Sequence, residues 1–338
     1  MDFKKTFLLF FLWLIVVNIF AIVALNRFNL KGDTAYSWID PAKALEAQSW
    51  DLAGLHARWD SVWYEDIAKQ GYSFRGAGEP SNVVFFPLYP FLLSILALSG
   101  LSITLLGWIL SSVFLFLALW YLFKLVKEFH PGIDASLVAL FLLLFPTAFF
   151  LNAVYTESLF LFLSVATFYY AFKKNFLLAC VFGMLASLTR VTGVLLAIPL
   201  AYEYFKGRKF SFPDFRFLSI LLVPLGTISF FLFHYLKFGD FFLFFKVEKW
   251  WGRAFALNYD HFTAVTHPAV VNLWIDSFFV IFALITTYFV FRRLKTSYGL
   301  YMLATVLVSL STGTFMSIGR YILVLFPIFI WLASVKNT

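Results

Sequence analysis

Hydrophobic runs of membrane-crossing length recur along the chain and are separated by short polar segments. A helix needs about 20 residues to cross the hydrocarbon core of a bilayer, and several of these runs approach that length. We therefore predict an all-α integral membrane protein in which residues 1–338 form a single polytopic domain. About ten crossings are expected, near residues 6–25, 103–123, 134–151, 157–172, 176–190, 191–205, 217–238, 273–291, 298–312 and 319–335.

Basic residues in the polar gaps orient these predicted crossings. They occur as Lys4 and Lys5, Lys124 and Lys127, Lys173 and Lys174, Lys206, Arg208 and Lys209, Arg292, Arg293 and Lys295, and Lys336. The positive-inside rule places all of these groups in the cytoplasm, together with both termini. Loops 26–84 and 239–272 are then expected on the outer side of the membrane.

One apolar run, 85–99, conflicts with this orientation if it crosses the membrane. A crossing there would move the basic groups at 173–174, 206–209 and 292–295 to the outside. We therefore predict a short helix at 85–99 that enters the membrane without crossing it. Such elements occur where surrounding protein shields them from lipid.

The composition narrows the class of protein further. Hydrophobic residues make up 62% of the chain and charged residues 13%, against about 25% charged residues in soluble domains. The net charge of +8 is spread over the groups that orient the helices, which argues against a nucleic-acid partner. No cluster of His, Cys, Asp or Glu has the spacing of a metal site, so we expect no metal or cofactor.

One segment of the first external loop has the pattern of an amphipathic helix. Trp59, Val62, Trp63 and Ile67 form one apolar arc, which we expect to lie on the outer surface of the bilayer. Asp60 falls beside this arc, where a carboxylate must be paired, cap the helix or serve a function. The sequence is compatible with an N-cap and with a catalytic acid or base at this position.

Other residues of the same segment are open to simpler interpretations. Glu65 and Lys69 fall on the far side of the predicted helix, where a solvated face explains them. Asp66 flanks the apolar arc, and the pattern does not choose between a structural and a functional role. His56 is explained by a solvated loop position.

Further charged residues gather at the predicted outer face. Glu157 begins a helix, where the dipole favours an acid. Arg190 has apolar sequence on both sides and needs an anion, which a structural pair with Glu157 or a lipid phosphate would supply. Lys249 and Arg253 flank tryptophans in a segment typical of interfacial anchoring, and Arg320 opens the last helix, where it can snorkel. Two acids and several cations on one membrane face suit chemistry on a lipid phosphate.

Three ordered sets of motifs resemble those of a known family. The first set consists of Arg58-Trp59-Asp60, Ile67-Ala68, Gly71-Tyr72 and Phe85-Phe86-Pro87-Leu88-Tyr89-Pro90. The second and third are Thr156-Glu157-Ser158-Leu159-Phe160 and Thr189-Arg190-Val191-Thr192-Gly193. In this order they resemble the first external loop and the next two motifs of the GPI mannosyltransferase 2 (PIG-V) family, over about residues 56–195. Gly319-Arg320-Tyr321 is similar to a motif of many polyprenyl-phosphate-dependent transferases.

The resemblance implies a fold, a reaction and a set of roles. It implies a GT-C glycosyltransferase with a catalytic acid in the first external loop, 26–84, that moves a hexose, typically mannose, with inversion from a polyprenyl-phosphate donor. The external loop 239–272 is expected to be interfacial because tryptophans and basic residues stand together in it. The site would face outward from the plasma membrane, among membrane lipids, and the acceptor would be a hydroxyl of a lipid, glycan or protein. The implied general base is Asp60, the phosphate-binding candidates are Arg190, Arg320, Lys249 and Arg253, and the supporting residues are Arg58, Trp59, Glu157 and Asp66.

The sequence departs from the family pattern at one motif. Arg58 stands where eukaryotic members tend to have His, and their large insertions are absent, which suggests a prokaryotic relative with another acceptor. Two other functions remain compatible with the residues. One is a flippase or transporter of lipid-linked sugars, and the other is a non-catalytic subunit of a glycosylation complex.

Overall fold

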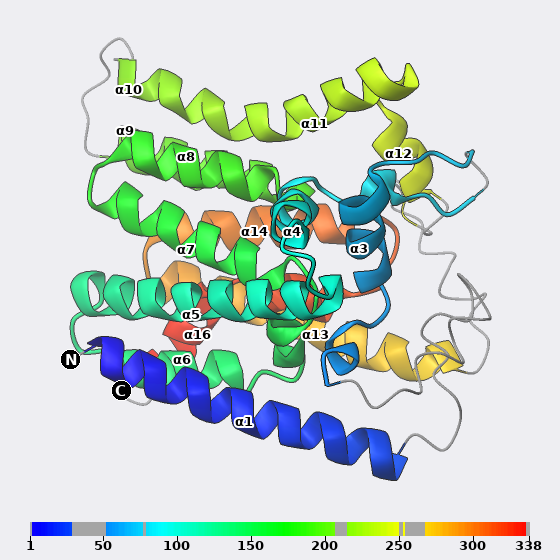
Figure 1. Ribbon diagram of the computed structural model, residues 1–338. Helices are drawn as coiled ribbons and strands as arrows, with labels where there is room; N and C mark the ends of the chain where they lie inside the picture. The colour runs from blue at the N-terminus through cyan, green and yellow to red at the C-terminus, as the bar shows by residue number, and fades with distance from the viewer. Residues whose placement is uncertain are drawn as a thin grey trace.

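The computed structural model describes residues 2–28, 52–76, 79–206, 215–249, 253 and 268–335. Within these ranges every regular element is a helix (Figure 1), as predicted. Residues 29–51 and 254–267, which belong to the two predicted external loops, lie outside the described part of the chain.

Four helices in the described ranges are long and apolar enough to cross a membrane. They are α1 (Asp2–Phe28), α5 (Ile103–Phe129), α11 (Leu222–Phe238) with its preceding turn, and α13 (Pro268–Arg293). The preceding turn is the 3-10 helix η5 (Ser219–Leu221), which follows the short helix α10 (Phe215–Leu218). Their outward faces expose large apolar side chains, such as Val16 at 64% and Phe278 at 62%. Exposed apolar faces of this extent fit contact with lipid.

Shorter apolar helices fill the space between the long ones. They are α6 (Ala135–Leu143), α7 (Glu157–Phe172), α8 (Phe176–Ser187), η4 (Val191–Leu196) with α9 (Ala197–Phe205), α14 (Thr296–Leu310), α15 (Ile318–Leu323) and α16 (Pro327–Val335). The predicted runs 134–151 and 319–335 are each broken in two. The first breaks between α6 and η3 (Ala148–Asn152), with Pro146 in the gap, and the second at Pro327, because proline cannot donate a helix hydrogen bond.

The basic groups that were predicted to be cytoplasmic lie, where the structure describes them, at one end of the bundle. The beginning of α1 and the ends of α5, α7, α9 and α13 carry them, and both chain termini mark the same end in Figure 1. The opposite end holds α3 (Ser61–Gln70) and α12 (Leu243–Glu248). The clustering therefore follows the predicted pattern, and the assignment of this end to the cytoplasm stays a prediction.

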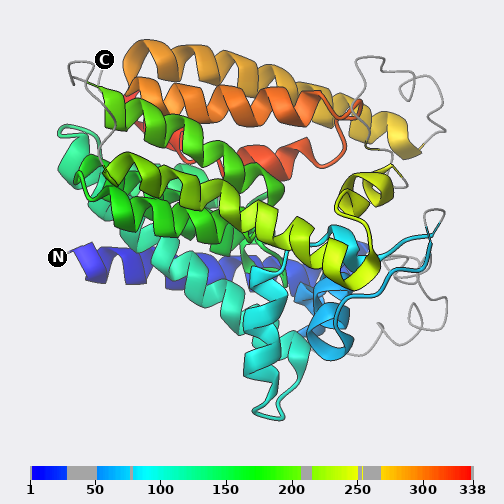
Figure 2. The same ribbon diagram turned by 90° about the horizontal axis from the view of Figure 1, so that it is seen from above.

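The short element predicted at 85–99 is the helix α4, Leu88–Ala97. Its ten residues rise about 15 Å, roughly half of the hydrocarbon thickness. It lies across the long helices rather than along them (Figure 2). A full crossing would need a longer helix than this one.

The first loop folds back onto the protein. Its described part contains η1 (Gly54–His56), α3 and η2 (Asn82–Val84). The apolar face of α3 is buried, with Trp63 stacked on Phe85 and Tyr64 packed edge-on against Tyr89. Trp59 precedes the helix and is 46% exposed. For Trp63 and Ile67 the expected contact with the bilayer is therefore wrong, because the segment after α3 returns and covers them with protein. For Trp59 the contact with the bilayer stays a prediction.

Candidate active site

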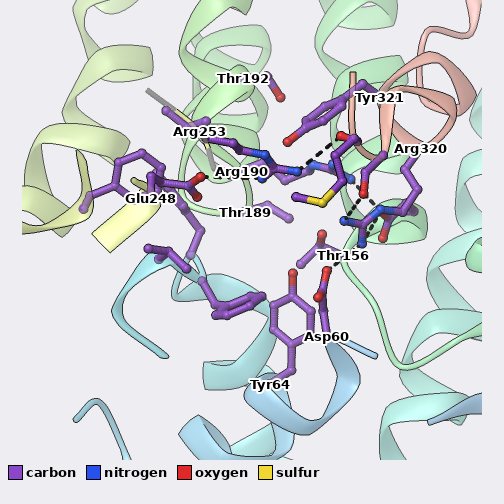
Figure 3. Close-up of a pocket in the computed structure, with 18 residues that line it drawn as sticks. Asp60, Tyr64, Thr156, Thr189, Arg190, Thr192, Glu248, Arg253, Arg320 and Tyr321 are labelled. Atoms are coloured by element: carbon purple, nitrogen blue, oxygen red, sulfur yellow. Dashed lines mark hydrogen bonds and ion pairs between the residues drawn. The ribbon is translucent and has the colours of Figure 1, made fainter. Parts of the chain in front are cut away.

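A cavity of about 160 Å³ opens at the α3 end of the bundle (Figure 3). It brings together the start of α3, residues 84–86, 156–157 and 189–192, the end of α12 with Arg253, and residues 316–321. Among the described residues, three carboxylates and three guanidinium groups line it, namely Asp60, Glu157, Glu248, Arg190, Arg253 and Arg320. The cavity is therefore polar, and the charges of its side chains balance.

Asp60 forms an ion pair across the cavity wall. Its Oδ2 accepts a hydrogen bond of 2.8 Å from Nη1 of Arg320. The backbone N–H of Asp60 donates to the hydroxyl of Tyr155 at 2.9 Å. Asp60 occupies the N-cap position of α3, but its side chain makes no capping hydrogen bond. The N-cap interpretation is therefore wrong for the carboxylate, which instead binds a cation.

Glu157 connects two of the arginines. Its Oε1 lies 2.9 Å from Nη1 of Arg190 and 3.9 Å from Nη1 of Arg320. The side chain is 1% exposed, and its Oε2 has no hydrogen-bond partner among the described residues. The pair with Arg190 that the sequence suggested is present. Arg190 also lines the cavity, so the pair leaves its ligand role open.

The family of the chain follows from a comparison with known protein families. The family model described as mannosyltransferase (PIG-V) matches residues 4–238, which is more than half of the chain. The chain belongs to the PIG-V mannosyltransferase family. No curated protein matches it.

The matched range of the PIG-V family model contains part of the cavity. Asp60, Glu157 and Arg190 lie inside residues 4–238, whereas Arg253 and Arg320 lie beyond them. The last two reach the cavity through the packing of the later helices. Asp60 and Arg320 are 260 residues apart in sequence and in direct contact in space.

The wall opposite Asp60 is formed by a third, looser ion pair (Figure 3). Nη1 of Arg253 lies 3.6 Å from Oε2 of Glu248, and the Arg253 guanidinium is within 5.8 Å of the ring centre of Tyr321. Burial raises the pKa of Glu248, and the nearby Arg253 opposes this rise. Sequence reasoning missed Glu248, because Lys and Trp neighbours gave its segment the pattern of an interfacial anchor. Lys249, the next residue, is exposed and does not line the cavity.

Three of the four supporting residues, Arg58, Trp59 and Asp66, do not line the cavity of this PIG-V family member. The backbone N–H of Arg58 donates to the hydroxyl of Ser61 at 3.1 Å, at the start of α3. Trp59 adopts a positive φ of 47° and packs near Phe149 and Phe150. Both residues therefore shape the turn that presents Asp60.

Asp66 binds Asn82, a residue of the loop that leads to the cavity. Its Oδ2 accepts a hydrogen bond of 2.8 Å from the Asn82 amide, which also donates to the carbonyl of Gly71. The Asn82 oxygen accepts from the backbone N–H of Ser73 at 2.9 Å. These bonds close the loop after α3 and carry residues 84–86 to the cavity wall.

His56 belongs to a buried polar cluster beside the site. Its Nε2 lies 2.8 Å from Oδ1 of Asn18, and its ring stacks on Trp108 with centroids 4.6 Å apart. Burial lowers its pKa to about 4. The expectation of a solvated histidine is therefore wrong. No group of three or more metal-ligating side chains occurs in the described part of the chain.

Proposed function

We propose that this PIG-V family glycosyltransferase moves mannose, with inversion, from a polyprenyl-phosphate donor to an acceptor hydroxyl at the outer face of the plasma membrane. The observation that carries the proposal is one cavity that holds a carboxylate, Asp60, together with the guanidinium groups of Arg190 and Arg320. A base and phosphate-binding cations are the groups that this reaction requires. Family membership favours a transferase over a flippase or a non-catalytic subunit.

In the proposed reaction Asp60 takes the proton of the acceptor hydroxyl. The acceptor oxygen then attacks the anomeric carbon from the side opposite the phosphate. The bond between that carbon and the phosphate oxygen breaks, and its electron pair leaves with polyprenyl phosphate. The leaving group needs no proton, since Arg190 and Arg320 stabilise its developing charge. Arg253 is a third cation for the phosphate, and Glu157 holds Arg190 in place.

An apolar groove beside the cavity supports a lipid-linked substrate. The groove has a volume of about 450 Å³ and is bounded mainly by α4 and α11, with Phe91, Phe230 and Phe233 among its lining. It reaches residues 87 and 188, which adjoin cavity residues 86 and 189 in the chain. Adjacent residues of the same two segments therefore line the groove and the cavity. A polyprenyl chain would find apolar surface close to the charged site.

The test is transfer of labelled mannose by the purified protein from polyprenyl-phosphate-mannose to lipid, oligosaccharide or peptide acceptors. Asp60→Asn should lower the rate about 100- to 10,000-fold, as expected for the loss of a general base. Its melting temperature should stay close to that of the wild type. Glu65→Gln is the matched control on the same helix, because a glutamine oxygen can still accept the hydrogen bond from Thr104. A rate for Asp60→Asn within a few-fold of the wild type would exclude Asp60 as the base.

A further inference from the structure

Asp60 and Arg320 form an ion pair with each other in the structure, although the proposed function assigns them to different substrates. Asp60 must face the acceptor hydroxyl, and Arg320 must hold the donor phosphate. We propose that the donor phosphate displaces the Asp60 carboxylate from Arg320, so that the base becomes available only after the donor has bound. This inference rests on the proposed function.

Contacts around the pair indicate that the carboxylate moves and the guanidinium stays. Nη2 of Arg320 donates to the hydroxyl of Ser317 at 3.1 Å. The guanidinium also lies within 5.4 Å of the ring centre of Phe150 and 5.3 Å of that of Tyr155. The Asp60 side chain, by contrast, is 20% exposed, and within the described residues its carboxylate pairs with Arg320 alone. Rotation of this side chain releases Arg320 without moving the backbone.

The charge balance of the cavity favours this exchange. Each of its three guanidinium groups has a carboxylate oxygen within 4 Å, at 2.8, 2.9 and 3.6 Å for Arg320, Arg190 and Arg253. A phosphate that enters therefore meets arginines that are each already paired with a carboxylate through Nη1, and it competes with that carboxylate for the Nη1 donor. It offers several acceptor oxygens to the planar fork of the guanidinium, which favours a bidentate contact. Of the two closest pairs, the one between Asp60 and Arg320 has the more exposed carboxylate.

The chemistry of transfer completes the exchange. The donor is a phosphodiester with one negative charge, and the released polyprenyl phosphate carries a charge of roughly −2. As the second charge develops, Asp60 accepts the proton of the acceptor and becomes neutral. A neutral acid no longer competes for Arg320, so the guanidinium is free for the leaving group when its charge is largest. Donor binding before acceptor activation follows from this sequence.

Direct binding measurements test the exchange. Purified wild-type and variant proteins are titrated with a polyprenyl phosphate, and the neutral polyprenol reports the contribution of the chain. Asp60→Asn should bind polyprenyl phosphate roughly 10- to 100-fold more tightly than the wild type, because Arg320 loses its competing carboxylate. In an Arg320→Gln background the same substitution should give no gain. An unchanged or weaker affinity of Asp60→Asn would overturn the exchange.

Two controls separate competition from a general effect of charge. A gain that persists in the Arg320→Gln background would show that removal of any negative charge suffices, and it would overturn the proposal. Glu248→Gln removes another carboxylate of the cavity while Arg320 remains, so it serves where Arg320→Gln fails to fold. A gain equal to that of Asp60→Asn would again refute competition for Arg320. A failure of the proposed function itself would give a different result from these two outcomes. The wild type would then bind polyprenyl phosphate no more tightly than polyprenol.

Discussion

Substitutions at the buried ion pair of Arg190 and Glu157 can separate a structural role from a role in donor binding. The joined atoms, Nη1 and Oε1, are 2.9 Å apart, and the side chains are 11% and 1% exposed. Removing one partner of a buried pair typically costs about 3–5 kcal/mol, because a charge remains without compensation. Arg190→Gln should lower stability less than Glu157→Gln does, since Nη1 of Arg320 stays 3.9 Å from Glu157.

The double mutant and a conservative variant complete the design. Arg190→Gln combined with Glu157→Gln should regain stability, with a coupling energy of about 1–3 kcal/mol between the two sites. Arg190→Lys keeps the positive charge and should retain most of the stability. It loses the fork that can hold two phosphate oxygens, so its apparent KM for the donor should rise about tenfold or more.

The assay pairs thermal unfolding in detergent with initial rates over a range of polyprenyl-phosphate-mannose concentrations. Glu65→Gln is again the control, because it leaves the cavity unchanged. A double mutant that regains both the melting temperature and the wild-type KM for the donor would refute the phosphate role. Arg190 would then be a structural partner of Glu157 only.

Three further predictions address the loop, the membrane topology and pH. Asp66→Ala should lower stability by about 1–3 kcal/mol by leaving the Asn82 amide unpaired, whereas Asp66→Asn, which can still accept that bond, should not; thermal unfolding checks both. In a cysteine-free background, an impermeant thiol reagent on intact cells should label Glu79→Cys but neither Lys127→Cys nor Lys174→Cys, and labelling at Lys127 would contradict a non-crossing α4. Because the pKa of His56 falls from 6.5 to about 4 on burial, the unfolded chain takes up its proton first on acidification. The stability from this group is complete above about pH 6.5 and is lost toward pH 4, by up to about 3 kcal/mol, and His56→Gln should flatten unfolding curves in that range.

The sequence by itself determined the class of fold and much of the list of charged residues. Apolar runs become helices because the helix satisfies its own backbone hydrogen bonds, the requirement that lipid imposes. The run at 157–172 therefore predicted both ends of α7, and the run at 103–123 predicted the start of α5, which continues to Phe129. Motif order predicted the family, since Asp60, Glu157 and Arg190 stand in segments that the family model matches.

Only the tertiary structure decided which charges meet. Asp60 and Arg320 come from opposite ends of the chain, and no local pattern specifies a contact across 260 residues. Glu248 faces the cavity because α12 folds back over it, whereas its neighbour Lys249 points to the surface. Trp63 and Ile67 of the predicted apolar arc are buried, but their partner is protein and not the expected lipid, since both offer the same apolar contact to a hydrophobic side chain. Local sequence specifies what a side chain needs, and the packing of distant helices decides which group supplies it.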